Sequence, residues 1–173
     1  MIDKVVMGKK DISNLVIKIS EEINIVYHEI EKITIVPILD AVFMFASDLS
    51  KRIRNVNTYF KFVKVESYNN GIPGKPILHT CISQSEIENR DVLIVDTIID
   101  SGNTIRLVRD EILKYCPKSL RICALVVKKN DNNKDIKVDF SHKSGVEGFL
   151  FGYGTDFEDG SHKNVEYIFS KKG

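Results

Sequence analysis

This chain of 173 residues has little cysteine and no excess of charge of either sign. Its three cysteines, Cys81, Cys116 and Cys123, are odd in number, widely spaced and not combined with histidine in a ligand pattern. They therefore indicate neither a disulfide framework nor a zinc site. The 25 basic and 24 acidic residues leave a formal net charge of +1, which excludes an electrostatic reason for binding nucleic acid or an anionic membrane. We therefore expect small-molecule partners.

Long apolar runs, repeats and extended low-complexity tracts are also missing. No uninterrupted apolar run approaches the roughly 20 residues that a membrane-spanning helix needs. The opening residues Met1–Lys4 lack the apolar core of a signal peptide, so a cytoplasmic location is expected. The asparagine-rich segment Lys128–Lys137 is interpreted as a polar connection. A chain of this length suits one domain, over residues 1–173, with a substantial core.

The apolar residues alternate between helical spacing and strand-like runs. This alternation favours an α/β fold with a parallel sheet. The turn-forming residues of Asn69–Pro76 predict an irregular, mobile loop, which cannot be regular structure. The periodicity predicts helices at 12–26, about 41–53 and 105–114, and strands at 33–38, 59–65, 92–95, 120–127, 148–153 and 165–169.

The most informative stretch begins with the aliphatic run Val92–Val95, which is typical of a strand buried on both faces. Such a strand delivers Asp96 and Asp100 to its carboxyl end, where open α/β folds bind their ligands. Capping of the next helix would explain one acid, whereas two acids favour a ligand site. The turn that follows supplies hydroxyls, an amide and unhindered N–H groups for a phosphate: Ser101, Gly102, Asn103 and Thr104.

The stretch from Val92 to Thr104 resembles the phosphoribosyl-pyrophosphate signature of type I phosphoribosyltransferases, specifically of their hypoxanthine-guanine branch. Ser67 and Tyr68 are similar to the pair that opens the mobile catalytic loop of that family. The segment Phe149–Asp156 is similar to its purine-site segment, so the resemblance covers nearly the whole chain. It implies the type I phosphoribosyltransferase fold, a parallel twisted sheet flanked by helices, with a small hood from the C-terminal or N-terminal part.

The resemblance implies a reaction of purine salvage. Hypoxanthine or guanine displaces pyrophosphate from phosphoribosyl pyrophosphate, with Mg²⁺ as cofactor, and IMP or GMP forms. Carboxylates beneath the ring suit the positively charged sugar of the transition state, while the leaving group needs a metal and cationic donors. Two alternatives stay open: a non-catalytic protein of the same fold that senses a nucleotide or phosphoribosyl pyrophosphate, and an enzyme for another base.

The family's phosphate-site residues carry over position by position. Asp100 resembles the acid that handles the proton on the imidazole nitrogen of the purine, a general-base role. Asp96 resembles the acid that holds the ribose hydroxyls, directly or through a hydrated Mg²⁺. Thr97 departs from the pattern, because the family usually has a second acid there for ribose and metal. The 5′-phosphate is expected on the turn: Ser101, Gly102, Asn103 and the hydroxyl of Thr104.

The resemblance also assigns a purine pocket. Lys128 looks like the lysine that donates to the exocyclic oxygen at purine position six, with the adjacent Lys129 as the alternative. Phe149 resembles the aromatic residue that stacks on the base, and Leu150 the residue whose backbone contacts its edge. Asp156 resembles the acid near the exocyclic group and the second metal ion. Without the neighbouring motif, Phe149 would be interpreted as an ordinary core residue.

The pyrophosphate site departs further from the family pattern. Its loop corresponds to Leu39, Asp40 and Ala41, where Asp40 replaces a lysine or arginine and would repel pyrophosphate unless a metal lies between them. Lys163, or His162 if no residue is inserted, stands where the family usually has an arginine that contacts pyrophosphate. A lysine lacks the planar two-pronged contact of arginine.

Two further expectations concern closure and assembly. Tyr68, next to Ser67 at the start of the proposed lid, would shield the sugar from water when the lid closes. The habit of the family and the general frequency of symmetric assemblies predict a homodimer or homotetramer.

Overall fold

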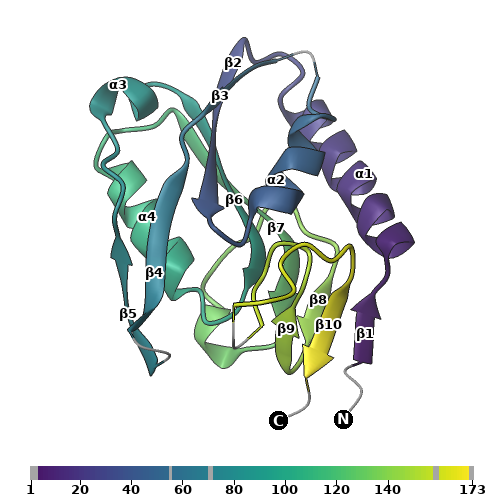
Figure 1. Cartoon of the computed structure of the whole chain (residues 1–173). Helices are drawn as coiled ribbons and strands as arrows, with labels where there is room; N and C mark the ends of the chain where they lie inside the picture. Colours follow the sequence, from purple (N-terminus) through teal and green to yellow (C-terminus); the bar gives the residue numbers. More distant parts are fainter. Residues whose placement is uncertain (1–3, 55, 70–71, 158–159, 172–173) are drawn as a thin grey trace.

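The computed structural model describes residues 4–54, 56–69, 72–157 and 160–171, and at 67–69 and 72–74 it describes the backbone alone. Its larger sheet contains β2 Lys32–Leu39, β3 Asn57–Phe60, β4 Val63–Asn69, β5 Ile72–Leu78, β6 Asp91–Ile99, β7 Ser119–Lys128 and β8 Ser144–Val146. The strand order is β5-β4-β2-β6-β7-β8, and β3 also pairs with β2 (Figure 1). All neighbours are parallel except β4 and β5.

A smaller antiparallel sheet joins the two ends of the described chain. Its strands are β1 Lys4–Met7, β9 Phe149–Phe151 and β10 Ile168–Lys171, in the order β1-β10-β9. In Figure 1 it lies below the larger sheet, next to β8. The expected architecture, a mostly parallel sheet with flanking helices and a small hood from the terminal segments, is confirmed.

Helices cover both faces of the larger sheet: α1 Lys9–Val26, α2 Phe43–Ser50, α3 Gln84–Ile87 and α4 Asn103–Leu113. Leu93 and Val95 of β6 pack in one apolar cluster with α1 and α2, whereas Val92 and Ile94 pack in a second cluster with α4. All four side chains are fully buried. Successive strand residues point to opposite faces, so a strand covered on both faces must be apolar throughout.

The prediction of an irregular segment at Asn69–Pro76 is wrong. Strand β5 begins at Ile72 and pairs antiparallel with β4, with Asn69 opposite Ile72 and Val65 opposite Leu78. Residues 70 and 71 lie outside the described part of the chain. The prolines of β5 are tolerated because β5 is an edge strand, which needs hydrogen bonds on one side only.

Other boundaries also differ from the prediction. The strand expected at 59–65 is two strands, β3 and β4, and the strand expected from Val165 begins at Ile168 as β10. The short strands β1 and β8 were not predicted. Helix α1 begins at Lys9 instead of near Ile12, and the carboxylate of Asp11 accepts a hydrogen bond from the Gly8 amide at 2.9 Å. Among the described residues, no helix has the length and apolar content to cross a membrane.

Candidate active site

The candidate site lies where the parallel strands β2, β6 and β7 end. The chain leaves β2 at Leu39, β6 at Ile99 and β7 at Lys128, so the loops that follow meet at one edge of the sheet. This edge is the usual ligand site of open α/β sheets. It brings together the proposed pyrophosphate loop, Asp96 of β6, Asp100 directly after β6, and Lys128 at the end of β7.

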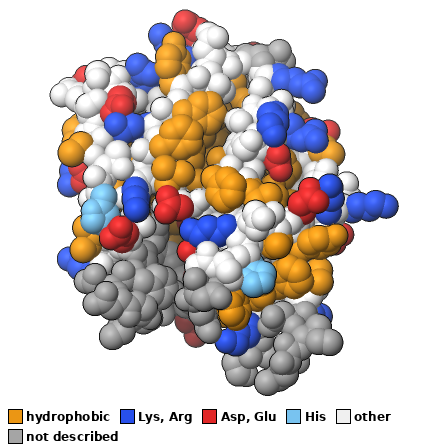
Figure 2. Space-filling view, viewed as in Figure 1, with side chains coloured by type: hydrophobic (Ala, Val, Ile, Leu, Met, Phe, Trp, Pro, Cys, Tyr) orange, Lys and Arg blue, Asp and Glu red, His pale blue; other side chains and the backbone are white. Residues whose placement is uncertain are grey.

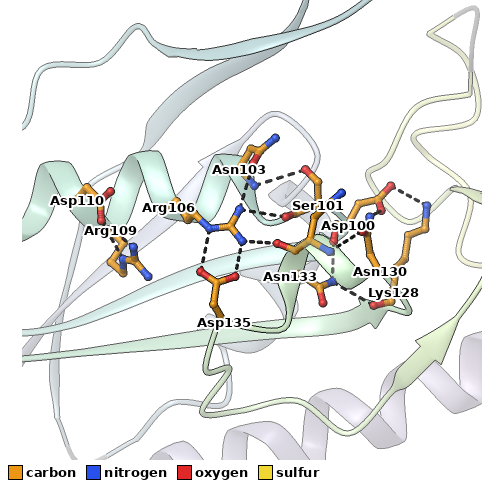
Figure 3. Close-up of polar contacts among 11 residues, drawn as sticks. Asp100, Ser101, Asn103, Arg106, Arg109, Asp110, Lys128, Asn130, Asn133 and Asp135 are labelled. Carbon is orange, nitrogen blue, oxygen red and sulfur yellow. Dashed lines mark hydrogen bonds and ion pairs between the residues drawn. The ribbon is translucent and has the colours of Figure 1, made fainter.

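Asp100 is held by donors from the segment after β7 (Figure 3). The Lys128 ammonium lies 2.6 Å from Oδ2 of Asp100, and the amide of Asn130 donates to Oδ1 at 2.9 Å. The amide of Asn133 donates to the main-chain carbonyls of Asp100, at 2.6 Å, and of Lys128, at 3.1 Å. Lys129 is instead exposed and paired with Glu147 at 3.2 Å. Of the two lysine alternatives, only Lys128 therefore contacts the candidate base.

The turn after Asp100 has a backbone shape that requires glycine. Gly102 has a φ of +79°, and a Cβ built there would lie 2.1 Å from Cδ1 of Ile136. Helix α4 begins at the next residue, Asn103. The first N–H groups of a helix have no partner within it, so this turn offers backbone donors to an anion. The structure thus places Ser101, Gly102, Asn103 and Thr104 together at a helix start.

One guanidinium ties this turn to the connection after β7 (Figure 3). Arg106 makes a two-pronged ion pair with Asp135, with Nε to Oδ2 at 3.1 Å and Nη2 to Oδ1 at 2.5 Å. Its Nη1 donates to the Ser101 carbonyl at 3.2 Å and to the Asn103 side chain at 3.0 Å. Its Nη2 also donates to the carbonyl of Asn132. The Arg106 hydrogen bonds hold the pKa of Asp135 below its ordinary value.

Asp96 is a partly buried carboxyl at the end of β6. Burial raises its pKa to about 7, although the amides of Thr97 and Ile98 donate to it and oppose the shift. The Thr97 amide lies 2.7 Å from Oδ1. A cation or sugar hydroxyls next to Asp96 would favour its ionised form.

Thr97 does not lie where a ribose ligand would contact its side chain. The alternation along β6 places it on the face of Leu93 and Val95, and it is fully buried. Its hydroxyl donates to the carbonyl of Ala41 at 3.0 Å. The Thr97 hydroxyl is therefore engaged by the proposed pyrophosphate loop.

The proposed pyrophosphate loop is held from two sides. Besides the Thr97 bond, the backbone of Gly154 packs so closely that a Cβ there would lie 2.3 Å from the Ala41 oxygen. The peptide between Leu39 and Asp40 is cis, and the Asp40 side chain is exposed. The carboxylate at position 40 thus stands at the surface of a loop fixed by β6 and by the segment after β9.

The proposed purine segment has a mixed environment. Phe149 is 38% exposed and stands edge-on to Phe157 at 6.3 Å between ring centres, whereas Leu150 is buried. The Lys163 ammonium lies 3.0 Å from Oδ2 of Asp156. His162 packs against the ring of Phe157. Of the two candidates for the missing arginine, Lys163 therefore contacts a proposed site residue, and its charge is engaged by Asp156.

The lid residues and the metal site are described less completely than the rest of the site. Ser67 and Tyr68 belong to β4, but their side chains lie outside the described residues. In the part of the chain that the structure describes, no group of three or more His, Cys, Asp or Glu side chains could hold a metal. Asp96 and Asp156 are separate carboxylates. Mg²⁺ in phosphate sites is commonly bound by one or two carboxylates plus substrate oxygens, so these residues fit it.

Comparison with known proteins agrees with this geometry. The family described as "Phosphoribosyl transferase domain" matches residues 8–158. The chain is 33% identical to a hypoxanthine phosphoribosyltransferase of Buchnera aphidicola, over 95% of this chain and 93% of the relative. It is 30% identical to a hypoxanthine-guanine phosphoribosyltransferase of Aquifex aeolicus, over 89% and 86%.

Solved structures give the same result. A hypoxanthine-guanine phosphoribosyltransferase of Bacillus anthracis superposes with a TM-score of 0.85 at 26% identity, covering 99% of both chains. A hypoxanthine phosphoribosyltransferase of Staphylococcus aureus gives a TM-score of 0.86 at 29% identity, over 98% of this chain and 91% of the other. The chain therefore belongs to the phosphoribosyltransferase family, in its hypoxanthine-guanine branch.

Proposed function

We propose that this chain is a purine salvage enzyme. It transfers the phosphoribosyl group of phosphoribosyl pyrophosphate to hypoxanthine or guanine and yields IMP or GMP and pyrophosphate. The observation that carries the proposal is the contact of Asp100 with Lys128, at 2.6 Å, directly before a glycine turn at a helix start. An acid, a cation and a phosphate turn at one sheet edge are what this transfer requires.

The base pocket has a division of roles. The imidazole nitrogen N9 of the purine forms a bond to the anomeric carbon as the bond to pyrophosphate breaks, and Asp100 takes the proton that the other imidazole nitrogen, N7, releases. Lys128 donates to the exocyclic oxygen at position six. Phe149, with its partly exposed ring, stacks on the base, and the backbone of Leu150 contacts its edge. Asp156 lies near the exocyclic group.

The sugar and phosphates occupy the rest of the sheet edge. The 5′-phosphate binds the amides and hydroxyls of residues 101–104. Asp96 holds the ribose hydroxyls or Mg²⁺, and Asp156 stands near a second metal position. When it is bound, Mg²⁺ neutralises the pyrophosphate leaving group. This role matters here because Asp40 adds a negative charge to the pyrophosphate loop, which otherwise offers the backbone of Leu39 and Ala41.

The cations and the lid complete the proposal. Lys163 is available to pyrophosphate only if it exchanges its ion pair with Asp156 for one with the leaving group. Ser67 and Tyr68, near the end of β4 in the β4 and β5 hairpin, cover the sugar and exclude water. The exchange of the Lys163 ion pair and the covering of the sugar both belong to the closed state of the enzyme.

The proposal includes a homodimer or homotetramer. Figure 2 shows hydrophobic side chains gathered on the face that carries β3 and α2. Exposed Phe43, Tyr59, Phe60 and Phe62 belong to these elements and their flanks. Such a patch on a soluble enzyme usually marks an interface. Light scattering after gel filtration would give the mass of the assembly, and a monomer would remove this part of the proposal.

The activity is tested with the purified chain, phosphoribosyl pyrophosphate, Mg²⁺ and one purine at a time. Pyrophosphate release and nucleotide formation should appear with hypoxanthine or guanine, and xanthine serves as a comparison. A parallel titration with IMP and GMP measures binding. Nucleotide binding without turnover of any purine would favour the alternative of a regulatory sensor on the same fold.

A further inference from the structure

The carboxylate of Asp100 has two different donors. Lys128 contacts Oδ2 at 2.6 Å, and Asn130 contacts Oδ1 at 2.9 Å (Figure 3). The two donors differ in freedom. A lysine ammonium sits on a flexible stem of four carbons. The Asn130 side chain is fixed at its other end as well, because its Oδ1 accepts the amide of Asn132 at 3.0 Å and caps the short turn η1 Asp131–Asn133.

The backbone of Asp100 is fixed separately from its side chain. The buried amide of Asn133 donates to the carbonyls of Asp100 and Lys128, which holds the ends of β6 and β7 at a constant spacing. That contact leaves the carboxylate torsion of Asp100 free. This torsion is broad for an aspartate, and the side chain is 53% exposed, so packing does not define the carboxylate plane.

We propose that Asn130 is the positioning residue of the general base. Its amide holds Oδ1 of Asp100, so that Oδ2 faces the purine. In a 6-oxopurine the imidazole nitrogen N7, from which the proton is removed, and the exocyclic oxygen lie on the same edge. The carboxylate oxygen next to Lys128 is therefore the one next to the N7 proton. Oδ2 of Asp100 accepts the proton. Asn130 keeps the Asp100 carboxylate in place when the Lys128 ammonium turns toward the purine.

This inference rests on the proposed function, because it needs Asp100 to be the base. Sequence reasoning missed Asn130 since it lies 30 positions from Asp100 in a segment interpreted as a polar connection. An asparagine in such a segment is ordinarily a solvated turn former. The contact of Asn130 with Asp100 forms only when β6 and β7 are paired.

Two substitutions separate the contact with Asp100 from the cap of η1. Asn130→Asp keeps the shape and the acceptor for the Asn132 amide, but it removes the donor and sets a second carboxylate against Asp100. Asn130→Ser keeps a good capping residue whose hydroxyl is too short to reach Asp100. Both variants should lower kcat by about ten-fold or more, since misplaced reacting groups cost at least that much.

The matched control is Asn132→Asp, the same substitution two residues along the same turn. The side chain of Asn132 is exposed, and only its backbone meets the network. Its kcat should stay within about two-fold of the unaltered enzyme, as is usual for a surface change. In all three variants the KM for phosphoribosyl pyrophosphate and the thermal midpoint should change little, because neither the phosphate turn nor the core is altered.

The outcomes are distinct. A lower kcat in Asn130→Asp and Asn130→Ser, with unchanged KM for phosphoribosyl pyrophosphate and an unchanged melting midpoint, supports the positioning role. Unchanged kcat in Asn130→Asp overturns it, and so does a loss of kcat that is matched by a loss of stability. If the unaltered chain itself shows no turnover, the proposed function fails first and this inference falls with it.

Discussion

Replacing Gly154 by alanine tests whether the proposed pyrophosphate loop is fixed by the segment after β9. Gly154 has a φ of +98°, and its Cβ position lies 2.3 Å from the Ala41 carbonyl oxygen. That oxygen is a backbone atom and also accepts the Thr97 hydroxyl at 3.0 Å. Real Cβ atoms essentially never lie closer than 3.0 Å to such an atom, so the carbonyl must retreat by about 0.7 Å to reach even a tight contact.

The magnitude follows from two costs. An L-residue in this backbone region costs about 1–3 kcal/mol. Moving the Ala41 carbonyl leaves the fully buried Thr97 hydroxyl without its acceptor, which costs about 1–3 kcal/mol more. Gly145→Ala is the matched control, because Gly145 has a φ of +73° and no atom lies within 4 Å of its Cβ position. Gly145→Ala should therefore show the backbone cost alone.

Urea and thermal unfolding measure the difference. Gly154→Ala should be less stable than Gly145→Ala by about 2 kcal/mol, or roughly 4–8 °C in melting midpoint for a chain of this size. It should also raise the KM for phosphoribosyl pyrophosphate, because the displaced loop is the proposed pyrophosphate site. Equal losses of stability in the two variants would show that the loop moves at no cost and that the Ala41 carbonyl is not held in place.

Three other predictions concern the charged groups of the site. Asp100→Asn should lower kcat by about 10²-fold or more with nucleotide binding retained, since it removes the proton acceptor at constant shape; unchanged turnover in the pyrophosphate-release assay would exclude Asp100 as the base. Arg106→Gln should raise the KM for phosphoribosyl pyrophosphate by roughly five-fold or more, because the phosphate turn loses its preorganisation, while Arg109→Gln, on the same helix, should not; equal KM values would contradict this. Asp40→Lys should strengthen product inhibition by pyrophosphate, and an unchanged inhibition constant would mean that position 40 faces elsewhere.

The centre of the fold was predictable because its signals are local. The aliphatic run Val92–Val95 identifies β6, and the acids and the glycine turn follow within a few residues. The orientation of Thr97 could also have been found, since period-two alternation places it on the face of Leu93 and Val95. The prediction for Thr97 did not use the alternation of side chains along β6.

The remaining features depend on pairing that a local pattern does not contain. Arg106 meets Asp135 across 29 positions, and Asn130 meets Asp100 across 30. Both contacts require the ends of β6 and β7 to be side by side and the loop after β7 to fold back. The prolines of β5 misled the prediction in another way, because the tolerance of an edge strand for proline depends on its place in the sheet.

The small sheet has a practical consequence for handling this protein. Strand β10 pairs with β1 on one side and with β9, which carries Phe149 and Leu150, on the other. An addition that displaces β1 or β10 would therefore disturb a sheet that also contains the proposed base-pocket residues. Inhibitor screening and crystallisation are best done after cleavage of such additions, with tagged and cleaved samples compared for guanine affinity.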